Sequence, residues 1–134
     1  MLTVSTSATA AIVGAIAILV SGAATARSLQ IEGKAGYLSE WDVIGDATDD
    51  PAASDTFRGR ISWKHTGLCT VNGPVEKSGD ITFKISGWGL FSRLDATMSF
   101  EQSQCTYSGS FSGQIKGTMD CTDAKGVPIK LSIK

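Results

Sequence analysis

The stretch Cys105 to Cys121, CTYSGSFSGQIKGTMDC, decides the fold of this chain. Its centre, Ser112-Gly113-Gln114, predicts a three-residue loop between two antiparallel strands. Folding about this loop gathers apolar and small residues on one face and polar residues on the other, because strand side chains alternate between faces. In the same register Cys105 lies opposite Cys121. The stretch therefore predicts a β-hairpin whose ends are joined by a disulfide.

The chain has one more cysteine, Cys69, so three pairings are possible in an oxidising compartment. The hairpin register favours Cys105 with Cys121. A bond that uses Cys69 stays open as an alternative, because opposed strand positions satisfy disulfide geometry only in some pair types. Closing the loop between Cys105 and Cys121 would stabilise the fold by about 3 kcal/mol.

Outward from the hairpin, apolar and polar residues alternate along most of residues 27–134, which indicates half-buried antiparallel strands. Glycine is expected to end the first strand at Gly45, and residues 46–55 and 72–79 have the composition of loops. Besides the two arms of the hairpin, strands are expected over about residues 37–44, 57–65, 68–71, 80–86, 93–100 and 127–134.

Seven or eight short strands in a meander predict an all-β fold. Such a meander closes most easily into a small up-and-down barrel, because closure removes exposed strand edges. A two-sheet sandwich is the alternative. An opening strand with a tryptophan, Gly36 to Trp41 (GYLSEW), followed by a meander resembles lipocalin-like and avidin-like barrels. The resemblance concerns the fold alone, since four residues separate Gly36 from Trp41 where lipocalins have one, and no binding residue is carried over.

The first 26 residues differ from the rest because they contain no charged side chain. An apolar run over residues 10–20 and the small-residue pattern Ala24-Thr25-Ala26 predict a signal peptide, residues 1–26, that is cleaved after Ala26. The alternative is an uncleaved anchor over residues 8–26, which is at the short limit for a membrane span. We expect one β-barrel domain, residues 27–134, in the periplasm or secreted, without stable membrane insertion.

Charge and motifs argue against several classes of function. A net charge of -1 gives no basic surface for nucleic acid. The chain has one histidine, His65, and no sequence motif of a nucleophile, a metal site or a cofactor site accompanies it. We interpret His65 as an imidazole at a strand end. The acidic residues near position 50 lack the spacing of a calcium loop and are expected to be solvated: Asp46, Asp49, Asp50 and Asp55. We expect no enzyme, no cofactor and no metal.

Strand alternation lapses at Gly87-Trp88-Gly89-Leu90-Phe91. Large apolar side chains between glycines could form a contact patch at a loop tip, and Trp88, Leu90 and Phe91 are the candidate partner-binding residues. The alternative is a plug in which Trp88 and Phe91 fold into the end of the barrel, since exposed aromatic residues are disfavoured in small soluble proteins.

The inward-facing aromatic residues could also line a ligand pocket, because eight-stranded barrels can enclose one small ligand. The candidate pocket residues are Trp41, Trp63, Phe83, Met98 and Tyr107. Bulky side chains on short strands could equally fill the interior. We expect a binding module or inhibitor that contacts a protein or envelope component; the alternative is a carrier of a small apolar molecule.

Overall fold

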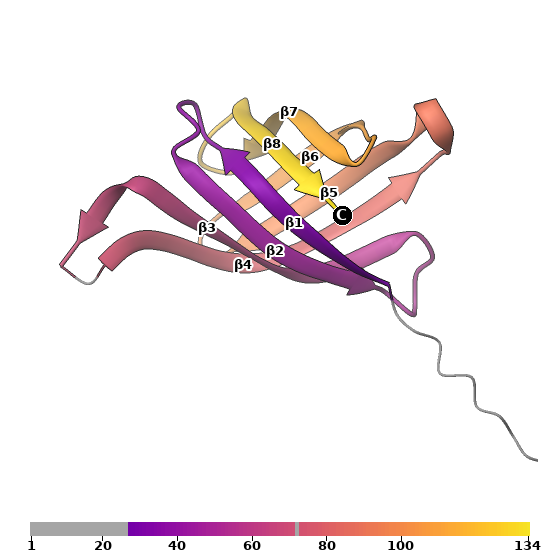
Figure 1. The fold of residues 1–134 in the computed structure, drawn as a ribbon, viewed down its shortest axis with the longest axis horizontal. Coiled ribbons are helices and arrows are strands. Elements are labelled where there is room, and N and C mark those ends of the chain that lie inside the picture. Colours follow the sequence, from indigo (N-terminus) through magenta and orange to yellow (C-terminus); the bar gives the residue numbers. More distant parts are fainter. Residues whose placement is uncertain (1–26, 72) are drawn as a thin grey trace, which may run out of the picture.

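The computed structural model describes residues 27–71 and 73–134, without the side chains at positions 68–70 and 74. The predicted signal peptide, residues 1–26, lies outside the described residues. Eight strands follow one another along the chain, with one short 3₁₀ helix between the fourth and the fifth (Figure 1). They are β1 (Ser28–Ala35), β2 (Trp41–Asp49), β3 (Thr56–Thr70), β4 (Gly73–Ser86), η1 (Gly89–Phe91), β5 (Arg93–Phe100), β6 (Gln104–Ser110), β7 (Gln114–Cys121) and β8 (Val127–Ile133).

The strands form one closed antiparallel barrel. Each strand pairs with the next along the chain, and β8 pairs back onto β1, with Ile31 opposite Ile133 and Ala35 opposite Ile129. The predicted up-and-down barrel is confirmed, and the sandwich alternative is wrong. Closure between β8 and β1 leaves neither of them as an edge strand, so their backbone polar groups find partners in each other.

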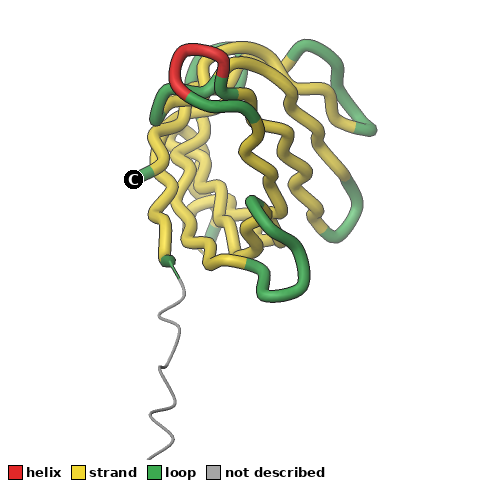
Figure 2. The backbone as a smooth tube through the Cα atoms, turned by 90° about the vertical axis from the view of Figure 1, so that its right-hand side faces the viewer, coloured by secondary structure: helices red, strands yellow, loops and turns green. Residues whose placement is uncertain are grey.

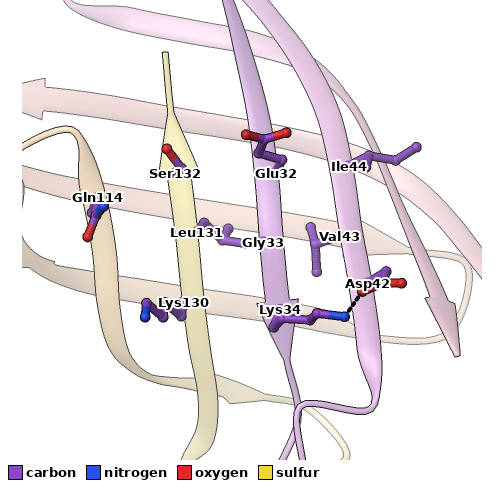
Figure 3. Close-up of a pocket in the computed structure, with 10 residues that line it drawn as sticks. All are labelled: Glu32, Gly33, Lys34, Asp42, Val43, Ile44, Gln114, Lys130, Leu131 and Ser132. Carbon is purple, nitrogen blue, oxygen red and sulfur yellow. Dashed lines mark hydrogen bonds and ion pairs between the residues drawn. The ribbon is translucent and has the colours of Figure 1, made fainter. Parts of the chain in front are cut away.

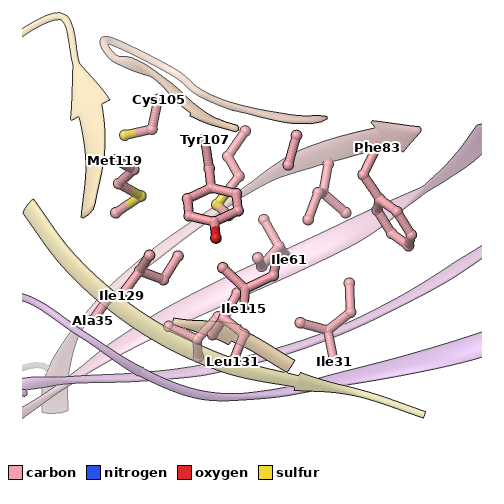
Figure 4. Close-up of a cluster of buried hydrophobic side chains, with 14 of the residues drawn as sticks. Ile31, Ala35, Ile61, Phe83, Cys105, Tyr107, Ile115, Met119, Ile129 and Leu131 are labelled. Carbon is pink, nitrogen blue, oxygen red and sulfur yellow. The ribbon is translucent and has the colours of Figure 1, made fainter. Parts of the chain in front are cut away.

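The barrel interior is packed with apolar side chains from all eight strands (Figure 4). Phe57 stacks on Phe83 with ring centroids 5.1 Å apart. The side chains expected to face inward over residues 57–65, 93–100 and 127–134 are buried, except His65 and Phe100, which are half-buried. The largest fully buried side chains are those of Val43, Ile31, Ile81, Phe83, Leu94, Met98, Ile115, Met119 and Leu131.

The predicted disulfide between Cys105 and Cys121 is confirmed, with an S–S distance of 2.01 Å. The predicted hairpin register holds there but does not continue to the loop, because β6 and β7 pair only at Cys105–Cys121 and Thr106–Asp120. Toward the loop, Phe111 N–H donates to the Ser92 carbonyl beside β5, while β7 follows β8 from Gln114 onward. The two strands are thus held by different neighbours and separate. The Cys69 side chain lies outside the described residues.

Three expectations about β1, β2 and the segment between them are wrong. β1 is not expected at all, because Gly33 interrupts its apolar face. Gly45 does not end a strand; it lies within β2, opposite Ile61 on β3. Tyr37 belongs to the turn between β1 and β2 and is 64% exposed, so the Gly36 to Trp41 segment is not an opening strand.

The fourth difference concerns β3 and β4, which are 15 and 14 residues long. The expected break at Thr66-Gly67 and the expected polar connection over residues 72–79 are wrong. Both strands instead run on as a long hairpin arm that projects at the left of Figure 1. Their register shifts between Lys64 and Cys69, where the arm leaves the barrel.

Strand polarity gives the barrel two ends. The η1 end carries η1, the β2–β3 loop, the β6–β7 loop and Arg27 at the start of the described chain; Figure 2 views the barrel from this end, with η1 in red. The opposite end, called here the arm end, carries the β1–β2, β5–β6 and β7–β8 connections and the β3–β4 arm.

Candidate functional site

Three large apolar side chains project from the η1 end. Trp88, Leu90 and Phe91, called here the apolar loop, are 83%, 98% and 82% exposed. Their backbone is compact, because Phe91 N–H donates to the Trp88 carbonyl (3.2 Å). Gly87 has a φ of +76°, and a Cβ there would lie 2.4 Å from the Phe91 carbonyl oxygen, so this turn requires glycine.

The exposure of the apolar loop shows that the plug interpretation is wrong. Leu94 and Ile115, which are fully buried, occupy the interior instead. The structure therefore places the three candidate partner-binding residues together on one exposed turn. Their binding role stays a prediction.

The five candidate pocket residues divide into two groups. Phe83, Met98 and Tyr107 are buried and belong to the hydrophobic core. Tyr107 lies over Gly109, since a Cβ at Gly109 would be 2.4 Å from its hydroxyl oxygen. The other two candidates, Trp41 and Trp63, line a hollow of about 140 Å³ at the arm end.

This aromatic hollow has three rings as its walls. The ring centroids of Trp41 and Trp63 are 6.1 Å apart with planes at 50°, and those of Trp63 and Phe100 are 5.2 Å apart at 69°. The ammonium group of Lys77 lies over the Trp41 ring, 4.6 Å from its centroid. The remaining lining comes from the connections of the arm end and from the adjoining ends of β6, β7 and β8: Gly36, Tyr37, Glu40, Ser103, Cys105, Cys121, Asp123, Ala124 and Val127.

Two carboxylates face the aromatic hollow. Hydrogen bonds from its own backbone N–H group and from Leu38 N–H, the latter at 2.8 Å, hold the pKa of Glu40 below its ordinary value. Asp123 accepts a hydrogen bond from the Ser103 hydroxyl (3.0 Å). The lining of the hollow thus carries two carboxylates and one ammonium group, that of Lys77. Sequence reasoning did not assign Glu40, Lys77 and Asp123 to a pocket, because they come from three separate segments.

Trp63, one wall of the hollow, carries a buried polar group that makes no hydrogen bond to any described residue. The residue is 4% exposed, and its buried indole N–H has no hydrogen-bond partner among the described residues. Leaving a buried donor unpaired costs about 1 to 3 kcal/mol. Trp63 is therefore held by its contacts with Trp41 and Phe100 and not by a hydrogen bond.

His65 borders the aromatic hollow without lining it. Its ring packs edge-on against Trp41 at 4.9 Å, and its Nδ1 accepts a hydrogen bond from Gly67 N–H (3.1 Å). It lies in β3 where the arm leaves the barrel. The expected position of His65 at a strand end is therefore wrong, because β3 continues past it to Thr70.

Two of the four acidic residues near position 50 form ion pairs. Asp49 accepts from the Arg27 guanidinium (3.1 Å), and Asp50 accepts from that of Arg58 (2.6 Å). These contacts hold the pKa of both carboxyl groups below their ordinary value. Within residues 27–71 and 73–134, no group of three or more His, Cys, Asp or Glu side chains could hold a metal ion.

A larger depression lies on the outer wall of the barrel across β8, β1 and β2 (Figure 3). Its volume is about 570 Å³, but its walls are the outward side chains of the strands, including Glu32 and Lys130. Lys34 and Asp42 form an ion pair across it. Oppositely charged neighbours of this kind are typical of solvated strand faces, so this depression is not a candidate site.

Comparison of the chain with protein-family models, with curated proteins and with solved structures found no match. Among the described residues, no helix is long and apolar enough to cross a bilayer. We therefore infer the function from the two ends of the barrel alone.

Proposed function

We propose that this chain is an exported, non-catalytic binding module or inhibitor that contacts a protein or another component of the cell envelope through the apolar loop. The observation that carries the proposal is the exposure of Trp88, Leu90 and Phe91 on one turn. Burying such a side chain against a partner contributes about 1.5 to 3 kcal/mol. Aromatic residues of this kind dominate the binding energy of many protein interfaces.

The backbone of the apolar loop supports the proposal because it is ordered by local contacts. β4 and β5 are paired up to Ser86 and Arg93, which leaves six residues for the connection. Hydrogen bonds from Phe91 N–H to Trp88 and from Ser92 N–H to Gly89 close the turn. A loop that is ordered before binding loses less conformational entropy when it binds.

Export is supported by the disulfide and by the sequence of residues 1–26. A structural disulfide such as Cys105–Cys121 persists in oxidising compartments and is rare in the cytosol. The apolar run before Ala26 is of the length expected for a signal peptide. Finding the N-terminus of the mature protein at Arg27 by mass spectrometry would support cleavage; an intact residue 1–26 segment would contradict it.

Site-specific photo-crosslinking in cells tests the binding role. A photoreactive residue at Leu90 should give a cross-linked product, and the same residue at Ile44, which is 63% exposed on the outer wall, should not. The Trp88→Ala/Phe91→Ala variant should lose the product while keeping its melting temperature. Equal cross-linking from positions 90 and 44, or an undiminished product in the double variant, would overturn the proposal.

The carrier alternative has less support, because the interior is packed and the aromatic hollow is about 140 Å³. Pockets for drug-sized ligands are roughly 300 to 1,000 Å³. A panel of apolar dyes and fatty acids tests this alternative. Saturable binding that Phe83→Leu or Met98→Leu alters would favour a carrier, and no binding across the panel would exclude those ligands.

A further inference from the structure

The aromatic hollow lies at the end of the barrel opposite the apolar loop and can be judged independently of it. We propose that it binds a small organic cation, namely a trimethylammonium group as in choline. Such groups are recognised by aromatic side chains that surround the cation, because the face of each ring carries negative charge. Three features of the hollow point to this ligand: its rings, its internal cation and its carboxylates.

The rings form a corner that a round cation can contact on several sides. Trp41, Trp63 and Phe100 are inclined to one another by 50° and 69°, so their planes do not stack into one flat surface. Tyr37 adds a fourth ring at the rim, where its hydroxyl donates to the Lys125 carbonyl (2.7 Å). Tryptophan is the aromatic residue that attracts cations best.

Lys77 shows that the hollow already attracts an ammonium group. Its Nζ lies 4.6 Å from the centroid of the Trp41 ring. The side chain comes from β4 at a position paired with Trp63, and the residue is exposed, so it can swing into solvent when another cation takes its place. Lys77 therefore acts as an internal competitor that an external cation must displace.

The charges favour a cation over an anion. Glu40 and Asp123 line the hollow, and the backbone N–H contacts of Glu40 keep its carboxylate ionised. With Lys77 displaced, the lining has two negative charges and no lysine or arginine. An anionic ligand would be repelled by both carboxylates, and a neutral ligand would gain nothing from them.

The volume limits the ligand to a group of this size. A cavity of roughly 150 Å³ in another protein holds one benzene molecule. The aromatic hollow, at about 140 Å³, is comparable and has room for a trimethylammonium group. Any longer chain attached to the cation would have to extend into solvent.

Fluorescence titration of the full chain tests the proposal. The chain has three tryptophans, so a Trp88→Phe background leaves Trp41 and Trp63 as reporters beside the hollow. We expect saturable changes with tetramethylammonium and choline. The uncharged analogue 3,3-dimethylbutanol, which has the shape of choline, should bind about tenfold more weakly or worse, as expected for a desolvated cation on aromatic rings. Equal affinity for choline and the analogue would overturn the proposal.

Lys77→Met and Glu40→Gln distinguish a cation site from a general apolar site, because both substitutions change charge and leave the aromatic rings in place. Lys77→Met should tighten choline binding several-fold, because the internal ammonium is gone; weaker binding would overturn the proposal. Glu40→Gln should weaken choline binding and leave the uncharged analogue unchanged. Trp41→Leu should abolish binding of both, and its circular dichroism spectrum checks that it folds. Unchanged choline binding in a folded Trp41→Leu variant would also overturn the proposal.

Vesicles distinguish a free ligand from a lipid headgroup. The Trp88→Ala/Phe91→Ala background removes the apolar loop as a source of membrane binding. If the protein is retained on phosphatidylcholine vesicles but not on phosphatidylglycerol vesicles, and Trp41→Leu removes this retention, the lipid headgroup is a ligand. Choline binding without retention would identify a free small molecule. Binding neither to choline nor to phosphatidylcholine would overturn the proposal, while the cross-linking test of the apolar loop would be unaffected.

Discussion

The disulfide between Cys105 and Cys121 joins β6 to β7 at one end of the only stretch over which these strands are paired within residues 104–121. Beyond Thr106 and Asp120 the strands separate, although every other pair of neighbouring strands has a longer ladder. The covalent bond therefore joins the two neighbouring strands that share the fewest paired residues. Two predictions about stability follow, one from this disulfide and one from the pairing of β1 with β8.

Removing the disulfide should destabilise the barrel. For Cys105→Ala/Cys121→Ala we expect a loss of roughly 2 to 5 kcal/mol in the free energy of unfolding, because the unfolded chain regains the entropy of an open loop. Urea denaturation measures the loss, and the wild type under reducing conditions should match the variant. Peptide mapping without reduction should show the Cys105–Cys121 link. A link from Cys69, or a variant as stable as the wild type, would contradict the structure.

Gly33→Ala should open the closure between β1 and β8. A Cβ at Gly33 would lie 2.0 Å from the Lys130 carbonyl oxygen and 2.8 Å from the Leu131 Cα, and both are backbone atoms. Overpacking of this kind costs about 1 to 3 kcal/mol. Gly67→Ala is the matched control, since its Cβ would make an ordinary contact with the His65 ring at 3.6 Å. Similar melting temperatures for the two variants would contradict the expected close approach.

The apolar loop should contribute little to stability. Trp88→Ala and Phe91→Ala should each change the free energy of unfolding by no more than about 0.5 kcal/mol, as is usual for exposed side chains. Phe83→Ala, which removes a buried ring stacked on Phe57, should cost about 3 to 5 kcal/mol. Chemical denaturation compares the three. A large loss for Trp88→Ala would mean that this side chain is packed in the core.

The ion pair of Asp50 and Arg58 should make stability depend on pH in the acid range. The hydrogen bond from Arg58 holds the folded pKa of Asp50 below the ordinary value of 3.8. This contribution is therefore complete above pH 3.8 and is lost as the pH falls through the folded pKa. Asp50→Asn should melt at a lower temperature than the wild type near neutral pH, and the difference should vanish in strong acid.

Arg58→Gln serves as the control for that prediction, because it removes the partner and leaves the carboxyl group. It should reproduce the neutral-pH loss seen for Asp50→Asn, and combining the two substitutions should add little. A constant difference between Asp50→Asn and wild type at every pH would show that the ion pair does not cause the effect.

The sequence predicts the strands well where large apolar residues alternate without interruption, as from Val127 to Ile133. It misses β1, where Gly33 occupies an inward position, and it ends β2 too early at Gly45. In both places the missing side chain marks a close approach of two backbones: a Cβ at Gly45 would lie 2.6 Å from the Arg60 carbonyl oxygen. A local pattern cannot distinguish such a glycine from one that ends a strand.

The candidate sites show the same limit. Exposure of Trp88, Leu90 and Phe91 depends on whether the end of the barrel is already filled, and residues far along the chain, such as Ile115, fill it. The aromatic hollow is harder still to predict. Its lining comes from seven of the strands and three of the connections, and no spacing within one segment indicates it.

The sequence by itself determined the all-β class, and it favoured the closed meander and the pairing of Cys105 with Cys121 over their alternatives. It could do so because inward and outward alternation is a local property with a period of two residues. Only the tertiary structure decided that the interior is packed, that the apolar loop projects, and that Trp41, Lys77 and Glu40 meet at one end. Those outcomes depend on how the strands are staggered around the barrel, and that stagger is set by all eight strands together.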